Sequence, residues 1–220
     1  MPGPDPFPQP RGLLVLRHAQ STWNAAGRWQ GWADPPLSQT GEQQVAVAGA
    51  ALRGGGLRQF PAVFSSDLQR ARRTAQGLAA ALEAPDPVAR PDLREHDIGL
   101  WSGLTRAEID ERWPGNVEGW STGALAATPG GESRAAFDAR VHAAFKEVAR
   151  VHPDEAVLVV CHGGVIRALT RMIGAPMTQV PSLSGCWIAF AGGELRVVAT
   201  VDLLSTPAQQ DVRGQDAIAE

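Results

Sequence analysis

The stretch AVLVVCHGG, residues 156–164, decides the fold class of this chain. Its first five residues are all apolar, which predicts a strand buried on both faces of a sheet. Apolar residues at helical spacing (Ile166, Leu169 and Ile173) follow directly. A buried strand that runs straight into a helix is the repeating unit of a parallel sheet. The histidine and glycines at the junction therefore stand where such a sheet binds its ligands.

The same succession of strand and helix recurs along the chain. Helical patterns follow Ser38, residues 65–67 and Ser133, and a closing hairpin turns at Gly192 and Gly193. The further predicted strands are residues 12–16, 63–64, 187–190 and 195–203. We therefore expect an α/β three-layer sandwich, with a mostly parallel central sheet, helices on both faces and a small cap made by insertions.

The two ends of the chain differ in composition from the rest. Residues 1–11 contain five alternating prolines, and residues 206–220 are mostly polar. Both patterns predict flexible tails. We expect residues 12–205 to form a single domain.

Composition excludes several classes of function. An apolar fraction of 44% predicts a folded globular chain, and a net charge of −3 gives no basic field for nucleic acid or an anionic membrane. No apolar run reaches the length of a membrane span, and the N-terminus has no signal-peptide pattern. The only two cysteines, Cys161 and Cys186, form no disulfide framework or zinc motif. We expect a cytoplasmic protein with a small-molecule partner; the oligomeric state stays open, with a homodimer as one option.

Two histidines and two arginines occupy equivalent places at the predicted strand ends. Arg17 and His18 follow the first strand, Arg70 begins the helix after the second, and His162 follows the strand at 156–160. Each alone would be an ordinary surface or hydrogen-bonded residue. Together they suit a phosphoryl group, because arginine binds phosphate with a bidentate fork and a helix N-terminus offers free N–H donors. An unprotonated histidine can attack phosphorus, and nearby arginines disfavour its protonation.

A set of short blocks resembles the histidine phosphatase superfamily, also called the phosphoglycerate mutase-like family. The blocks run in the family's order over roughly residues 12–200. They are LRHAQSTWN (16–24), GWADPPLSQTG (31–41), SSDLQRA (65–71), LRE (93–95), GLWSGL (99–104), GGES (130–133) and CHGG (161–164). A single motif would be weak, but an ordered series is specific.

The resemblance implies a role for each matching residue. His18 is implied as the nucleophile that accepts the phosphoryl group, and Glu95 as the acid and then the base. The implied catalytic set is His18, Arg17, Arg70, Glu95 and His162; the implied substrate-binding set is Ser21, Asn24, Gln30, Gly31 and Gly163. No cofactor or metal ion is expected. One position departs from the family, because Ala19 stands where glycine is usual; we interpret it as a tolerated variation.

Some residues allow a second interpretation. Cys161 and Arg167 fit the C-x5-R phosphate loop of cysteine-dependent phosphatases, but Val160 and Ala168 differ from that class. That hypothesis also leaves His18 without a role, so we expect Cys161 to be a buried strand-end residue. His96 would either line the pocket or make an ordinary hydrogen bond. The tryptophans of the motif segments would either wall the pocket or pack in the core: Trp23, Trp29, Trp32 and Trp101.

Within the family, the chain resembles phosphatases more than mutases. Glu95 and Glu132 lie only 37 positions apart, room for one helix (105–113) and a loop. A short cap admits water, whereas a mutase must exclude it. Residues 93–114 and 130–134 look similar to actinobacterial glucosyl-3-phosphoglycerate phosphatases. We expect a phosphatase for a small phosphomonoester, a sugar phosphate or phosphoglycerate-type metabolite; the alternatives are a mutase and a non-catalytic protein that binds phosphorylated ligands.

Overall fold

The structure, a computed structural model, describes residues 11–55 and 60–205 and is built around one mixed sheet of six strands. The strand order is β3-β2-β4-β1-β5-β6. The first four strands in this order are parallel, and β5 and β6 add an antiparallel hairpin beside β1. The strands are β1 (Gly12–Arg17), β2 (Ala62–Ser66), β3 (Val88–Arg90), β4 (Ala156–Cys161), β5 (Ser184–Ala191) and β6 (Glu194–Asp202).

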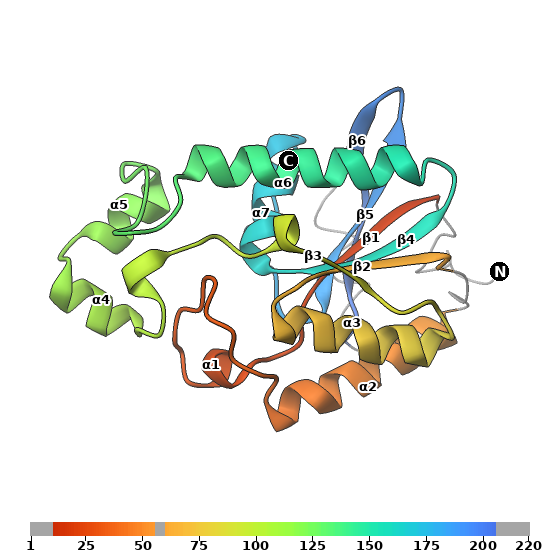
Figure 1. Cartoon of the computed structure of the whole chain (residues 1–220), viewed down its shortest axis with the longest axis horizontal. Helices are drawn as coiled ribbons and strands as arrows, with labels where there is room; N and C mark the ends of the chain where they lie inside the picture. The colour runs from red at the N-terminus through yellow and green to blue at the C-terminus, as the bar shows by residue number, and fades with distance from the viewer. Residues whose placement is uncertain (1–10, 56–59, 206–220) are drawn as a thin grey trace, which may run out of the picture.

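Helices cover both faces of the sheet, as Figure 1 shows. One layer is formed by α2 (Gln39–Gly54) and α3 (Gln69–Leu82), and the other by α6 (Arg134–Val151) and α7 (Gly163–Met172). Ser38 caps α2 by accepting a hydrogen bond from the Gly41 N–H, as its position predicted. The expected three-layer α/β sandwich is confirmed.

The central strands explain why the chain folds in layers. In β1, Leu13 and Val15 pack in the core under α6 and α7, whereas Leu14 and Leu16 pack in the core under α2 and α3. Successive side chains of a strand point to opposite faces, so a continuous apolar run supplies both cores. The neighbouring strand β4 alternates in the same way. The most apolar strands of the sequence therefore lie at the centre of the sheet.

A cap of short elements lies beyond one end of the sheet (Figure 1). It comprises α1 (Thr22–Ala25), α4 (Arg106–Arg112) and α5 (Asn116–Thr122), with a 3₁₀ turn at Gly99–Trp101. A second 3₁₀ turn, Pro91–Leu93, packs against β2 and α6 instead. The cap's own apolar cluster is centred on the fully buried Trp101. The sequence analysis predicted one helix and a loop between Glu95 and Glu132, and the loop was wrong: α5 occupies part of it.

The remaining predicted strands, helices and hairpin are confirmed, with boundaries shifted by one to three residues. Strand β3 was not predicted, because it is three residues long and mostly exposed at the sheet edge. The predicted tails, residues 1–11 and 206–220, lie outside the described residues except for Arg11. No helix within residues 11–55 and 60–205 is long and apolar enough to cross a membrane.

Candidate active site

The carboxyl ends of the central parallel strands open onto a cavity of about 350 Å³ whose other side is lined by residues of the cap, among them Ile98 and Trp120. Seven of the ten predicted site residues line it: Arg17, His18, Asn24, Gln30, Gly31, Arg70 and Glu95. The volume suits a small ligand. The cavity lies at the carboxyl ends of the parallel strands, where the sequence predicted the ligand site.

His18 stands at the end of β1 and is 3% exposed. Its ring Nδ1 lies 2.6 Å from the carbonyl oxygen of Ala19, which can only accept, so Nδ1 carries the proton and Nε2 keeps its lone pair. Burial, followed by the Arg70 and Arg17 guanidinium groups, holds the pKa of His18 well below its ordinary value. The ring is therefore neutral at pH 7, with one nitrogen able to act as a nucleophile.

Ala19, the departure from the family's glycine, fits without strain. Its backbone is not in the positive-φ region that favours glycine. Its N–H donates a hydrogen bond to the hydroxyl of Thr74 on α3 at 3.1 Å, and that hydroxyl donates in turn to the Arg70 carbonyl at 2.7 Å. The loop after His18 is thus fixed to the helix that carries Arg70.

His162 lies beside His18 at the end of β4. The two ring centroids are 5.1 Å apart and the rings meet edge to face. His162 is fully buried, and neither ring nitrogen has a hydrogen-bond partner. Burial first, and then the charges of Arg70 and neighbouring groups, hold its pKa well below the ordinary value. A buried polar ring left without partners is expected to bind a ligand group.

Two buried arginines flank the histidines. Arg17 donates from Nη1 to the Val180 carbonyl at 2.7 Å, and Arg70 donates to the carbonyls of Ala33 and Gly31 at 2.8 and 2.9 Å. The Nε of each is buried without a partner. Burial lowers the pKa of Arg70 to about 10, so the group stays charged at pH 7. Buried cations with spare donors favour an anion such as phosphate.

Glu95 faces the same cavity from the cap side. Its Oε2 accepts the Gly164 N–H at 3.0 Å, and its Oε1 accepts the His96 N–H at 2.9 Å. A Cβ on Gly164 would lie 2.0 Å from Oε1, so this close approach requires glycine. The carboxyl group is thereby held at the N-terminus of α7, against the N–H of the second residue after His162.

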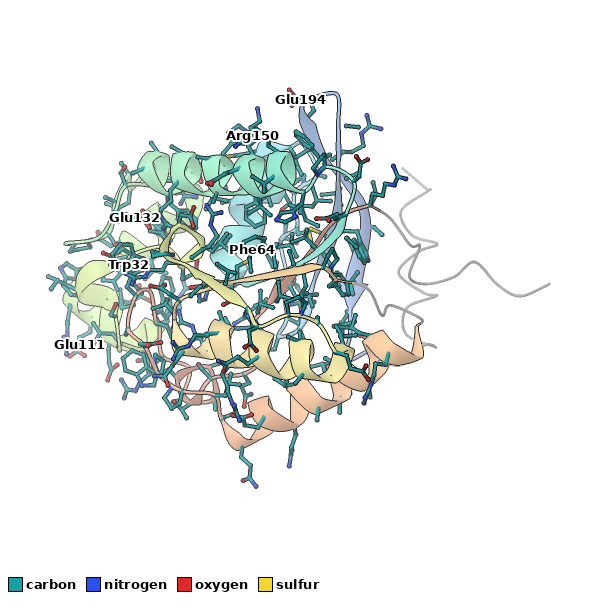
Figure 2. The ribbon with its side chains drawn as sticks, turned by 45° about the vertical axis from the view of Figure 1, so that its right-hand side comes forward. Trp32, Phe64, Glu111, Glu132, Arg150 and Glu194 are labelled. Carbon is teal, nitrogen blue, oxygen red and sulfur yellow. The ribbon has the colours of Figure 1, made fainter. Side chains whose placement is uncertain are left out.

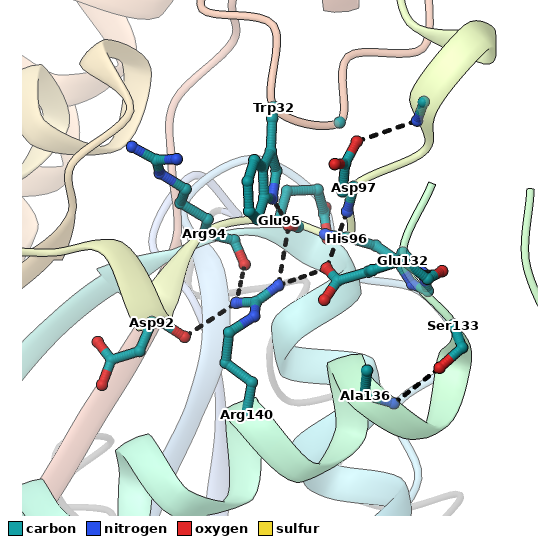
Figure 3. Close-up of polar contacts among 12 residues, drawn as sticks. Trp32, Asp92, Arg94, Glu95, His96, Asp97, Glu132, Ser133, Ala136 and Arg140 are labelled. Atoms are coloured by element: carbon teal, nitrogen blue, oxygen red, sulfur yellow. Dashed lines mark hydrogen bonds and ion pairs between the residues drawn. The ribbon is translucent and has the colours of Figure 1, made fainter. Parts of the chain in front are cut away.

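Figure 3 shows how Arg140 of α6 holds the segment that carries Glu95. The guanidinium donates to the carbonyls of Asp92 and Arg94, each at 2.9 Å, and to the carbonyl of Glu95 at 3.3 Å. It also pairs with the carboxylate of Glu132, which accepts the Asp97 N–H at 2.9 Å. These contacts of Arg140 were not predicted from the sequence, and they give Glu132 of the GGES block a positioning role.

Three predicted site residues do not line the cavity: His162, Ser21 and Gly163. His162 is fully buried beside His18. Ser21 is fully buried; it caps α1, and its hydroxyl donates to Gln30 Oε1 at 2.8 Å. Gly163 is buried against the side chain of Arg17. Ser21 and Gly163 therefore support the wall instead of forming it.

Several residues that line the cavity were not among the predicted catalytic and substrate-binding residues. Four further arginines line the cavity, together with Trp120, Phe137 and Asp138: Arg28, Arg134, Arg167 and Arg171. His96 also lines it, with its ring 4.6 Å from Trp120 and 4.4 Å from Phe137 between centroids. Of the four tryptophans considered above, only Trp29 is a lining residue. Arg134 and Trp120 belong to the cap side, where the sequence offered no strand end to mark a site.

The cysteine hypothesis finds no support in the structure. Cys161 is fully buried and does not line the cavity. Burial raises the pKa of its thiol well above the ordinary value, so no thiolate forms at neutral pH. Burial raises the pKa of Cys186 to about 12. Within the described part of the chain, His, Cys, Asp and Glu side chains form no group of three or more that could hold a metal ion.

Comparisons with known proteins agree with this geometry. The family model described as "Histidine phosphatase superfamily (branch 1)" matches residues 13–202. A glucosyl-3-phosphoglycerate phosphatase of Mycobacterium tuberculosis is 38% identical over 186 residues, which cover 80% of this chain and 81% of the relative. A 2,3-bisphosphoglycerate-dependent phosphoglycerate mutase of Bartonella henselae is 35% identical over 164 residues, with 72% and 79% covered.

The fold comparison agrees as well. The solved structure of a mycobacterial glucosyl-3-phosphoglycerate phosphatase in complex with VO3 superposes with a TM-score of 0.76 at 32% identity. The match covers 86% of this chain and 98% of that one. The ordered motifs, the fold and the paired histidines at the strand ends thus lead to one conclusion: this chain belongs to the histidine phosphatase superfamily.

Proposed function

We propose that this chain is a metal-independent phosphatase that hydrolyses a small phosphomonoester through a phosphohistidine formed on His18. The observation that carries the proposal is the environment of that ring. His18 is neutral with Nε2 free, and the unpartnered donors of Arg17, Arg70 and His162 surround it. Such a set binds a phosphoryl dianion and places a nucleophile against it.

The first half of the reaction transfers the phosphoryl group to the enzyme. The Nε2 lone pair of His18 forms a bond to phosphorus while the bond from phosphorus to the leaving oxygen breaks. Glu95 gives its proton to that oxygen, which departs as an alcohol. Arg17 and Arg70 offset the negative charge on the phosphoryl oxygens, the task that a metal ion performs elsewhere.

The second half of the reaction returns the enzyme to its starting state. A water molecule attacks phosphorus and gives a proton to the Glu95 carboxylate. The N–P bond breaks, His18 regains its electron pair, and phosphate leaves. Glu95 thus acts first as acid and then as base, and no proton or electron pair is left over.

Hydrolysis is favoured over mutase activity by the cap. It offers only two seven-residue helices, α4 and α5, between Glu95 and Glu132. A mutase has to keep water away while the phosphorylated enzyme waits for its intermediate. The similarity to glucosyl-3-phosphoglycerate phosphatase supports a sugar phosphate or phosphoglycerate-type substrate.

A panel of phosphomonoesters assayed with EDTA present tests the proposal. Phosphate release from p-nitrophenyl phosphate and from at least one sugar phosphate or phosphoglycerate is expected, with competitive inhibition by vanadate. Loss of activity in EDTA that a divalent ion restores would refute the metal-independent mechanism. Faster isomerisation of 3-phosphoglycerate than phosphate release would identify a mutase instead.

We further propose that residues 12–205 form the whole catalytic domain and that the protein acts in the cytoplasm. One apolar core on each face of the sheet, continuous through β1 and β4, supports a single folding unit. A truncated chain of residues 12–205 should keep the activity of the full chain. Loss of activity on truncation would place a functional residue in one of the tails.

A further inference from the structure

We infer that His96 selects substrates whose alcohol part carries a further hydroxyl group, and that the ring accepts a hydrogen bond from this hydroxyl at Nδ1. This inference rests on the proposed phosphatase function and concerns the part of the substrate that departs when the phosphoryl group is transferred. It assigns a specificity role to a residue that the mechanism above does not use.

The ring of His96 is fixed in place by its neighbours. Its Nε2 lies 2.9 Å from the carbonyl oxygen of Glu132, which can only accept, so Nε2 carries a proton. The ring packs against Trp120 and Phe137, with centroid distances of 4.6 and 4.4 Å. The backbone N–H of His96 donates to the carboxylate of Glu95 at 2.9 Å, which ties the residue to the proposed acid (Figure 3). The ring therefore keeps one orientation beside the reacting groups.

The second ring nitrogen of His96, Nδ1, is left open to the cavity. In the neutral ring this atom holds the lone pair, because the proton is on Nε2. No donor in the described part of the chain forms a hydrogen bond to it, and it is not among the sealed polar atoms that lack a partner. Since His96 lines the cavity, Nδ1 is an acceptor that a ligand can reach.

The other acceptors on the cavity wall are already in use. Three lining side chains outside the reaction hold acceptor oxygens, and each already accepts hydrogen bonds from the protein: Asn24, Gln30 and Asp138. The first two accept from Ser21 at 3.1 and 2.8 Å, and the third accepts from Arg171 at 2.7 and 2.8 Å. His18 and Glu95 take part in the chemical step. Among the described lining side chains, this leaves His96 to accept from the rest of the substrate.

A free acceptor selects for a hydroxyl group and not for an anion. An ionised carboxylate or phosphate has no hydrogen to donate, whereas an alcohol hydroxyl donates one hydrogen bond and can also accept. An analogue without the hydroxyl leaves the acceptor unpaired, and such a site disfavours that analogue. The inferred substrates are therefore phosphate esters of a polyol, a hydroxy acid or a sugar, and simple alkyl phosphates are disfavoured.

The test compares pairs of substrates that differ in hydroxyl groups and not in charge. 3-Phosphoglycerate is paired with 3-phosphonooxypropanoate, which lacks its hydroxyl, and glycerol 3-phosphate is paired with n-propyl phosphate, which lacks both hydroxyls. The readout is the ratio of kcat/KM within each pair, which does not depend on the fraction of enzyme that is correctly folded.

Three variants separate the acceptor from the ring. His96→Phe removes both ring nitrogens and keeps an aromatic ring beside Trp120. His96→Asn keeps an acceptor oxygen near the position of Nδ1. His142→Phe makes the same change on α6 at a residue that does not line the cavity, and it is the matched control.

We expect His96→Phe to lower the preference for the hydroxylated member by about tenfold in at least one pair, the effect of losing one hydrogen bond. His96→Asn should recover much of that preference, and His142→Phe should leave it unchanged. The change in the ratio on substitution is the measure, because the alcohols within a pair also differ in their pKa as leaving groups.

Equal losses of kcat/KM on both members of each pair would show that His96 only positions Glu95, and this result would overturn the inference. Unchanged kcat/KM in His96→Phe on all four substrates would overturn it as well. In both cases the wild type would still release phosphate, whereas a wild type that releases phosphate from no phosphomonoester would refute the proposed function itself.

Discussion

The two ends of the cavity are built in different ways. At the phosphate end, Arg17 is the last residue of β1, His18 and His162 follow directly on β1 and β4, and both histidines are almost completely buried. At the cap end, Trp120 comes from the short helix α5 and Arg134 is the first residue of α6, and both are only half-buried. The phosphate end is fixed by the core of the fold, so we expect it to perform chemistry common to many substrates. The cap end can vary without disturbing the sheet and is suited to choosing among them.

Glu95 lies between the two ends of the cavity. Replacing its carboxyl group should cause the largest loss of activity that differs between substrates. Glu95→Gln should lower kcat on a sugar phosphate by about 10²–10⁴-fold, because an alkoxide needs a proton as it leaves. The loss on p-nitrophenyl phosphate should be distinctly smaller, because p-nitrophenolate leaves largely unaided. Steady-state kinetics on both substrates give the comparison, with Glu111→Gln, exposed on the cap (Figure 2), as the control. Equal losses on both substrates would show that Glu95 only positions the pocket.

Arg70 belongs to the phosphate end alone, so its loss should affect all substrates alike. Arg70→Met should lower kcat/KM by about 10²–10³-fold, the usual cost of removing a donor aimed at transition-state charge. Arg72→Met, two positions along α3 and exposed, is the control. Arg70→Lys, which keeps the charge, should recover part of the loss if the fold is intact. If the loss in kcat/KM were larger for substrates whose leaving group has a higher pKa, Arg70 would have the role that is assigned to Glu95.

Trp120 belongs to the cap end, and its removal should change binding more than chemistry. Trp120→Ala should raise KM by about tenfold for a sugar phosphate or phosphoglycerate and leave kcat within about twofold, the pattern expected when a wall contact is lost equally from ground and transition states. Trp120→Phe should restore most of the affinity, because a ring would again pack beside His96. A fall in kcat with unchanged KM would assign the cap a part in the chemical step.

The buried histidines should also make the phosphate end sensitive to acid. The pKa values of His18 and His162 are lowered in the folded chain, so below about pH 6.5 the unfolded chain binds protons that the folded chain does not. The free energy of unfolding should therefore fall as pH drops, by about 1.4 kcal/mol per pH unit for each histidine. Urea titrations at pH 7.5 and 5.0 measure this loss. The loss in free energy of unfolding should be smaller in the double variant with His18→Gln and His162→Gln. An equal loss in the wild type and the double variant would contradict the neutral, buried state of the two rings.

The sequence predicts the phosphate end of the cavity better than the cap end. The core strands and the residues after them are local patterns, so Arg17, His18 and His162 could be placed from apolar runs alone. Arg140 could not, because its partners lie 45 to 48 positions away and only the packing of α6 brings them together.

The cap and its first helix, α4, were predicted, but α5 was not, for a second reason. Helix α5 has seven residues between Gly115 and Gly123, both at positive φ, too short for a periodic pattern to be recognised. Ser21 shows the converse limit: it belongs to a matching block, but its hydroxyl is used to cap α1. A motif thus identifies the segment without saying which of its side chains face the ligand.

The most direct test of the central claim is to trap the phosphorylated enzyme. Brief mixing with a ³²P-labelled phosphomonoester, followed by denaturation, should leave a label that is labile in acid and stable in base, as phosphohistidine is. Peptide mapping should place it on His18, and His18→Ala should show neither label nor turnover. A label on Cys161, or activity that survives in His18→Ala, would contradict the account.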